Sequence, residues 1–125
     1  MDNSKRSSFK KGFLKINKQS YTTEEIQSRV DAYISQFKEG YFSPLSLMAR
    51  LTEETGELAR EISHFHGEKP KKSSEKAGSI EEEVGDIIFV LACFANSLDF
   101  KLDEAFEQSM RKFEVRDENR WTKKE

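Results

Sequence analysis

Apolar side chains recur at helical spacing in four segments of this 125-residue chain. In the first segment, Thr22 followed by Glu25 has the pattern of a capping box, which predicts a helix that begins there and ends near Gly40. One face of this helix carries the apolar residues Ile26, Val30, Tyr33, Ile34 and Phe37. A single apolar stripe of this kind indicates a helix that packs against others through one side.

A second helix is expected where Ser43, a favoured N-cap, precedes Pro44 at the first helical position. It should run to about Phe65. Its apolar seam, with steps of three or four residues, consists of Leu47, Leu51, position 54, Leu58 and Ile62. Position 54 is a glutamate, so a charged side chain interrupts the stripe.

A third helix is expected from Ser79, which with Glu82 has the pattern of a second capping box, to about Leu98. Its seam consists of Ile80, position 83, Ile87, Leu91, Phe94 and Leu98. Position 83 is again a glutamate, so this stripe is interrupted in the same way. A fourth helix is expected near residues 102–115, where apolar residues again recur at helical spacing.

No segment alternates apolar and polar residues with period two, so the predicted fold class is all-α. Four helices with two long central ones predict a four-helix bundle, either antiparallel within the chain or completed by a partner chain. Residues 21–125 are expected to form this one domain, with a polar connection over residues 64–79. Residues 1–20 are expected to be a flexible basic arm, either a disordered tail or a contact for a membrane or nucleic acid.

Composition favours an oligomer. Hydrophobic residues make up 35% of the chain and charged residues another 35%. This apolar content is low for a chain of this length, which buries only about two thirds of its unfolded surface as a monomer. We therefore expect long, half-exposed helices that complete their core in a homo-oligomer.

The formal net charge of −2 divides into +5 for residues 1–20 and −7 for the rest. An acidic domain binds nucleic-acid polymers poorly, so a polyanionic substrate would need a cation to mediate the contact. The single cysteine, Cys93, excludes an intramolecular disulfide, and no segment has the length of a membrane span or the apolar core of a secretory signal. These features predict a cytoplasmic protein without a membrane contact.

The two glutamates in the seams each have a second acid three residues further on, Glu57 after Glu54 and Asp86 after Glu83. Helical residues three apart point in similar directions, so both acids of a pair face the same side. A carboxylate in an apolar stripe stays ionised only if a cation or several hydrogen bonds replace its lost water. Two facing pairs predict a site for Mg²⁺, or Mn²⁺ in its place, because both are hard ions that prefer oxygen ligands.

Each acidic pair encloses a glycine, Gly56 in one helix and Gly85 in the other. Glycine within a helix costs about 1 kcal/mol relative to alanine, so the matched positions predict a close approach of the two helices there. The competing interpretation is that glutamate-rich runs such as LTEETGE are solvated helix faces without function. Paired motifs that both lie on apolar seams favour the metal site.

The segments LTEETGELAREI, EEEVGDIIFVLACFANSL and KFEVRDENRW resemble the MazG-like all-α nucleoside triphosphate pyrophosphohydrolases, over about residues 22–123. The resemblance implies that Glu54, Glu57, Glu83 and Asp86 are catalytic metal ligands. It implies Mg²⁺-dependent hydrolysis of nucleoside triphosphates, with non-canonical or deoxy nucleotides among them, to monophosphate and pyrophosphate by a homodimer or homotetramer. One loosely engaged acid, Glu57 or Glu54, would orient or deprotonate the attacking water.

Five further residues are candidate substrate contacts. Lys112 and Arg116 lie one turn apart at the end of the fourth helix and are expected to bind the pyrophosphate part of the substrate, as basic residues of this segment do in MazG-like relatives. The alternative is that they are cations favoured by the helix end. Asn96, a polar residue in an apolar run, either faces the substrate or caps the helix end. Phe42 and Trp121 either stack on the base or are ordinary packing residues.

Two other functions compete with the pyrophosphohydrolase. Glu61 and His64 have the ExxH pattern of di-iron bundles, but such a site needs a second ExxH, and the other histidine, His66, lacks one. A helical interaction module, whose acidic face recognises a basic partner, needs no Mg²⁺. Mg²⁺-dependent release of pyrophosphate therefore distinguishes the enzyme from this module.

Overall fold

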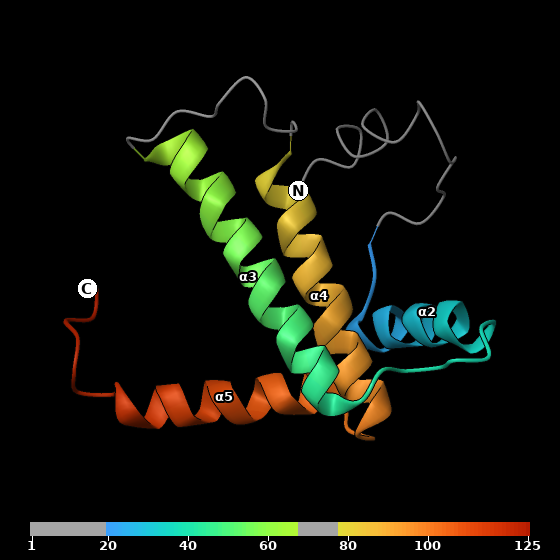
Figure 1. Ribbon diagram of the computed structural model, residues 1–125. Coiled ribbons are helices and arrows are strands. Elements are labelled where there is room, and N and C mark those ends of the chain that lie inside the picture. The colour runs from blue at the N-terminus through green and yellow to red at the C-terminus, as the bar shows by residue number, and fades with distance from the viewer. Residues whose placement is uncertain (1–19, 68–77) are drawn as a thin grey trace.

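The computed structural model describes residues 20–67 and 78–125, which form four α-helices (Figure 1). They are α2 (Thr23–Ser35), α3 (Pro44–His66), α4 (Ile80–Ser97) and α5 (Leu102–Arg116). No strand occurs in these residues, which confirms the all-α class. Within the same two ranges, no helix combines the length and apolar character needed to cross a membrane. The basic arm, except for Ser20, and most of the predicted connection lie outside the described residues.

The helices begin at the predicted caps. Thr22 Oγ1 accepts a hydrogen bond from the Glu25 backbone at 3.1 Å, and the Glu25 carboxylate accepts one from the Thr22 backbone at 2.9 Å, so this capping box is complete. Ser43 caps α3 as predicted. Ser79 Oγ accepts from the Glu82 backbone at 2.9 Å, but among the described residues no return bond from Glu82 accompanies it. Only half of the second predicted box forms.

α2 is shorter than predicted. It ends at Ser35, and the chain turns before it reaches Gly40. The φ of Gly40 is 65°, a left-handed conformation that glycine adopts at little cost. This glycine therefore belongs to the turn between α2 and α3 and does not mark the helix end. The other three helices begin and end within about one residue of their predicted positions.

α3 and α4 lie side by side as a long antiparallel pair, and α2 packs against both α4 and α5 (Figure 1). α5 leaves the end of this pair where α3 begins, and its C-terminal half points away from both long helices. A closed four-helix bundle therefore does not form within the described part of a single chain. Apolar residues on α5 stay exposed as a result; Phe106, for example, is 65% exposed.

The core lies where α2, α3 and α4 meet, and it is small. Its buried members are Val30, Leu47, Ala92 and Cys93. This core corrects the predicted seams: Leu98 of α4 is 51% exposed, and near the end of α3 Glu61 is buried while its neighbour Ile62 is exposed. α4 packs against two helices at once, so its buried surface is wider than one stripe and is rotated away from the predicted seam.

A polar network joins α2 to the C-terminal end of α4. Asn96 Nδ2 donates to the Gln27 carbonyl and to the Tyr41 hydroxyl, both at 2.9 Å, and Gln27 Nε2 donates back to Asn96 Oδ1 at 3.0 Å. The Gln27 amide also accepts from the Leu102 backbone at 2.8 Å and donates to the Phe100 carbonyl at 3.1 Å. A fully paired amide network of this kind is rigid. It fixes where α5 begins relative to α2 and α4.

Replacement of Asn96 by alanine is expected to lower the free energy of unfolding by about 1–3 kcal/mol, because partly buried groups of Gln27 lose their partner. Urea unfolding followed by circular dichroism measures the change. Gln108→Ala, which removes an exposed amide from α5, is the control and should stay within about 0.5 kcal/mol of wild type. An Asn96→Ala chain as stable as wild type would contradict a structural role for this amide.

Candidate metal centre

Three of the four predicted acids converge between α3 and α4. Glu54 of α3 and the pair Glu83 and Asp86 of α4 each offer a carboxylate oxygen, and these oxygens all lie within 4.8 Å of one another. Glu57 lies about one turn after Glu54 and is not part of this group of three. The antiparallel pairing of the two long helices thus brings together acids that are about thirty residues apart in the sequence.

Two of the three carboxylates, Glu83 and Asp86, have raised pKa values. Burial raises the pKa of Glu83, and the charges of Asp86, Glu57 and Glu54 raise it further. Burial likewise raises the pKa of Asp86, with the charge of Glu54 as the next contribution. The side chain of Glu54 is only 13% exposed, so water does little to screen the group. The cluster therefore favours either a bound proton or a cation.

Arg50 is a member of this site that the sequence analysis missed. Its Nε donates to Glu54 Oε2 at 2.9 Å, and this hydrogen bond raises the pKa of the arginine. Burial raises the pKa of both Asp86 and Cys93, and the positive charge of Arg50 opposes both shifts. The sequence does contain a sign of this contact. Arg50 lies one turn before Glu54, and helical residues four apart are neighbours.

Glu61 is another residue whose position the sequence analysis did not predict. It is 4% exposed, and its charge is among those that raise the pKa of Glu83. Its carboxylate lies against the backbone of Gly78, where an added Cβ would be 3.1 Å from Oε2, so glycine permits this close approach. Neither Glu61 nor His64 belongs to the converging acids of the described residues, which gives the di-iron alternative no support.

The three acids suit a hard divalent cation. Mg²⁺ binds oxygen ligands at about 2.1 Å, so two ligand oxygens on one ion lie at most about 4.2 Å apart. The carboxylate oxygens lie within 4.8 Å of one another, so a small movement of the side chains would bring them to this distance. All three donors are carboxylates, which favours Mg²⁺ or Mn²⁺ over zinc, and the exposure of Asp86 leaves room for water and substrate.

The prediction for the two glycines was wrong. A Cβ added at Gly56 or Gly85 would meet nothing within 4 Å, so neither glycine marks a close approach of helices in the described chain. Each glycine follows its acid by two residues, which turns it about 200° around the helix and away from the face that carries Glu54 or Glu83.

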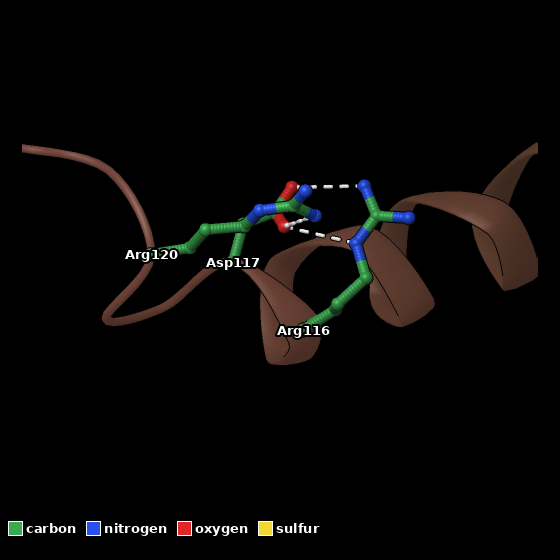
Figure 2. A network of polar contacts seen from close by, with 3 residues as sticks. All are labelled: Arg116, Asp117 and Arg120. Carbon is green, nitrogen blue, oxygen red and sulfur yellow. Dashed lines mark hydrogen bonds and ion pairs between the residues drawn. The ribbon is translucent and has the colours of Figure 1, made fainter.

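The basic residues of α5 are engaged with their own segment. Figure 2 shows Arg116 bound to both carboxylate oxygens of Asp117, at 2.9 and 3.1 Å, with Arg120 near the same carboxylate at 3.4 Å. Lys112 Nζ and the Arg116 guanidinium both lie about 5 Å from the ring centroid of Phe113. The end of α5 points away from the helices that carry the acids (Figure 1). A single chain therefore does not bring these two cations to its own acidic cluster.

The other three candidate substrate contacts are Asn96, Phe42 and Trp121. Asn96 is committed to the amide network between α2 and α4. Phe42 and Trp121 are exposed, and the guanidinium of Arg120 lies 5.0 Å from the centroid of the Trp121 ring. Contact of these three residues with a substrate stays a prediction.

Glu83→Gln is expected to be more stable than wild type in metal-free buffer, and its advantage should grow with pH. A raised pKa means that the folded chain binds more protons than the unfolded one, so stability falls as pH rises from about 4 through the raised value. The variant carries a neutral amide at this position and lacks this dependence. Calorimetry in chelator between pH 4 and 8 measures the difference in Tm, and Glu114→Gln, an exposed acid of α5, is the control. A stability advantage of Glu83→Gln that becomes smaller as the pH rises would contradict repulsion among the carboxylates.

Comparison with known proteins connects this geometry to a family. The family model of the MazG nucleotide pyrophosphohydrolase domain matches residues 42–121, which include all four predicted acids. The chain is 64% identical over 104 residues to the uncharacterized protein YpjD of Bacillus subtilis (strain 168), which covers 83% of this chain and 94% of that protein.

Two solved structures agree with this match. The crystal structure of YPJD from Bacillus subtilis is similar with a TM-score of 0.68 and 63% identity, over 75% of this chain and 96% of that one. A Bacillus-conserved MazG protein, a nucleotide pyrophosphohydrolase, is similar with a TM-score of 0.68 and 53% identity, over 82% of this chain and all of that one. The chain therefore belongs to the MazG nucleotide pyrophosphohydrolase family and is a hydrolase.

Proposed function

We propose that this enzyme hydrolyses nucleoside triphosphates, including non-canonical or deoxy nucleotides, to nucleoside monophosphate and pyrophosphate with the help of Mg²⁺. The observation that carries the proposal is the convergence of three carboxylates from two antiparallel helices, in a chain of the MazG family. Such an activity removes unwanted nucleotides from the cellular pool, which goes with a cytoplasmic location.

In this proposal Glu54, Glu83 and Asp86 hold the cation, and Glu57 completes the set of ligands or acts beside it. A bound Mg²⁺ would neutralise charge on the triphosphate and make a water molecule more acidic. The carboxylates fix the cation on two rigid helices, so the substrate's α-phosphorus is held in one place relative to the attacking water.

Glu57 is the better of the two candidates for orienting or deprotonating that water. Glu54 is part of the converging group and also accepts a hydrogen bond from Arg50, so its oxygens are engaged. Glu57 lies outside the group but near enough for its charge to raise the pKa of Glu83. A carboxylate beside a metal site is placed to accept a proton from water as the water attacks.

The shape of the chain supports a homodimer or homotetramer. The predicted phosphate contacts Lys112 and Arg116 lie on α5, which extends away from the acids of its own chain (Figure 1). α5 also exposes Phe106, Phe113 and Val115, and an apolar surface of this kind marks an interface. We therefore place the basic end of α5 near a neighbouring copy of the chain, where its charge complements an acidic cluster.

The reaction is tested with a panel of canonical, deoxy and modified nucleoside triphosphates. Wild type with Mg²⁺ is expected to release pyrophosphate and a monophosphate, detected by chromatography, and chelator should abolish the release. Glu83→Gln is expected to lose at least about 100-fold in kcat while it keeps its helical circular dichroism. If no nucleotide yields pyrophosphate and Mg²⁺ does not raise the Tm, the chain is instead the non-catalytic interaction module.

Arg50 is expected to compete with the cation for Glu54. Arg50→Gln should therefore bind Mn²⁺ or Mg²⁺ about two- to fivefold more tightly in a calorimetric titration, since one ion pair, exposed mainly on its arginine side, no longer has to break. Its kcat/KM should fall, because the freed guanidinium is a ligand for a substrate phosphate oxygen.

Arg111→Gln is the matched control for this test. Arg111 Nε donates to Glu107 Oε2 at the same 2.9 Å, in a pair of the same helical spacing on α5. Its removal should leave metal affinity unchanged. Unchanged or weaker binding of metal by Arg50→Gln would show that Arg50 supports the site rather than competing in it.

A further inference from the structure

A groove between α2 and α4 is lined by aromatic residues, among them Phe89, which lies about one turn after Asp86 on α4. It has a volume of about 370 Å³, within the range of about 300–1,000 Å³ that small-ligand sites occupy. Its lining consists of Tyr21, Ile26, Arg29, Val30, Tyr33 and Phe89. The proposed function assigns no role to any of these residues.

Aromatic rings make up much of the lining of the groove. Tyr33 and Phe89 meet edge to face, with ring centroids 6.1 Å apart, and Tyr33 remains 52% exposed. Arg29 lies one turn before Tyr33 on α2; its Nη1 donates to the Tyr21 hydroxyl, and its guanidinium lies 5.6 Å from the Tyr21 ring centroid. Rings with an exposed face stack on any planar base, and the guanidinium adds hydrogen-bond donors at the rim.

One stripe of α4 contributes a residue to both the groove and the metal centre. Asp86, Phe89 and Cys93 are spaced by three and four residues, so they share one side of this helix. Phe89 lies about 4.5 Å along the axis from Asp86, and long helical side chains lean towards the helix N-terminus, which is the direction of Asp86.

We infer that this groove is the subsite for the nucleobase of the substrate, with Tyr33 and Phe89 as the stacking face and Arg29 as a donor to base carbonyl oxygens. The inference rests on the proposed function, since a base belongs here only if the triphosphate is held at the neighbouring acids. It places the base on α2 rather than at Phe42 or Trp121, the positions predicted from the sequence.

The test compares a nucleotide with a base-free analogue. A nucleoside triphosphate with a methylene group between its α- and β-phosphorus atoms and inorganic triphosphate are each titrated calorimetrically, with Mg²⁺, into the full chain. Tyr33→Leu keeps an apolar side chain but removes the ring. This variant is expected to bind the nucleotide analogue about tenfold more weakly than wild type and to bind inorganic triphosphate with unchanged affinity.

Phe37→Leu is the matched control. Phe37 meets Tyr33 edge to face at 5.4 Å but does not line the groove, so any general loosening of the ring cluster appears in this variant too. It should bind both probes as wild type does. If Tyr33→Leu weakens the binding of both probes equally, or of neither probe, the base does not lie in this groove.

A second measurement separates this inference from the proposed function. In chelator, an excess of nucleoside without phosphates should shift the ring NMR signals of Tyr33 and Phe89 in wild type. If wild type binds neither triphosphate probe and releases no pyrophosphate, the proposed function fails, whereas the nucleoside titration still tests the groove. Absence of these shifts, together with a change of oligomeric mass in Tyr33→Leu, would identify a second copy of the chain as the occupant and overturn the inference.

Discussion

The repulsion among three carboxylates at the contact of α3 with α4 is the constraint on which the rest of this structure depends. Glu54, Glu83 and Asp86 have to stay close for a cation to bind, although their charges push the two helices apart. The apolar core with Leu47 and Cys93 holds the pair together near the start of α3 and the end of α4. The helices are therefore fastened at one end, and the acids are placed beyond the apolar contacts.

Glu61 and Arg50 show how the acidic end of the pair remains closed. Glu61 is buried against the backbone of Gly78, just before the first turn of α4, and so fixes where that helix starts relative to α3. Arg50 offsets part of the charge of Glu54 through a hydrogen bond that remains partly exposed. An exposed ion pair contributes little to stability, and for the same reason it yields easily to a divalent cation.

The sequence was sufficient to predict the helices and three of the acids that converge, because both depend on local spacing. Caps such as Ser43 mark helix starts by their own hydrogen bonds, and a glutamate within an apolar stripe is visible without any partner helix. The width of the buried surface on α4 could not be predicted in this way, since it depends on packing against both α2 and α3. Arg50 was missed because a basic residue one turn before an acid is also an ordinary surface pair.

Asn96 shows why a polar residue in an apolar run is ambiguous from the sequence alone. A substrate contact and a structural amide leave the same pattern, and only the partners distinguish them. In the structure its amide is paired with Gln27 and Tyr41, so its burial is already compensated without a ligand.

The position of α4 between two helices puts the acidic cluster and the aromatic groove on one element. The side that faces α3 carries carboxylates, and the side that faces α2 carries Phe89. These two sides are only about 60° apart around the helix where Asp86 is followed by Phe89. A single rigid helix thereby sets the distance between a charged site and an aromatic groove, and loops are not needed for that purpose.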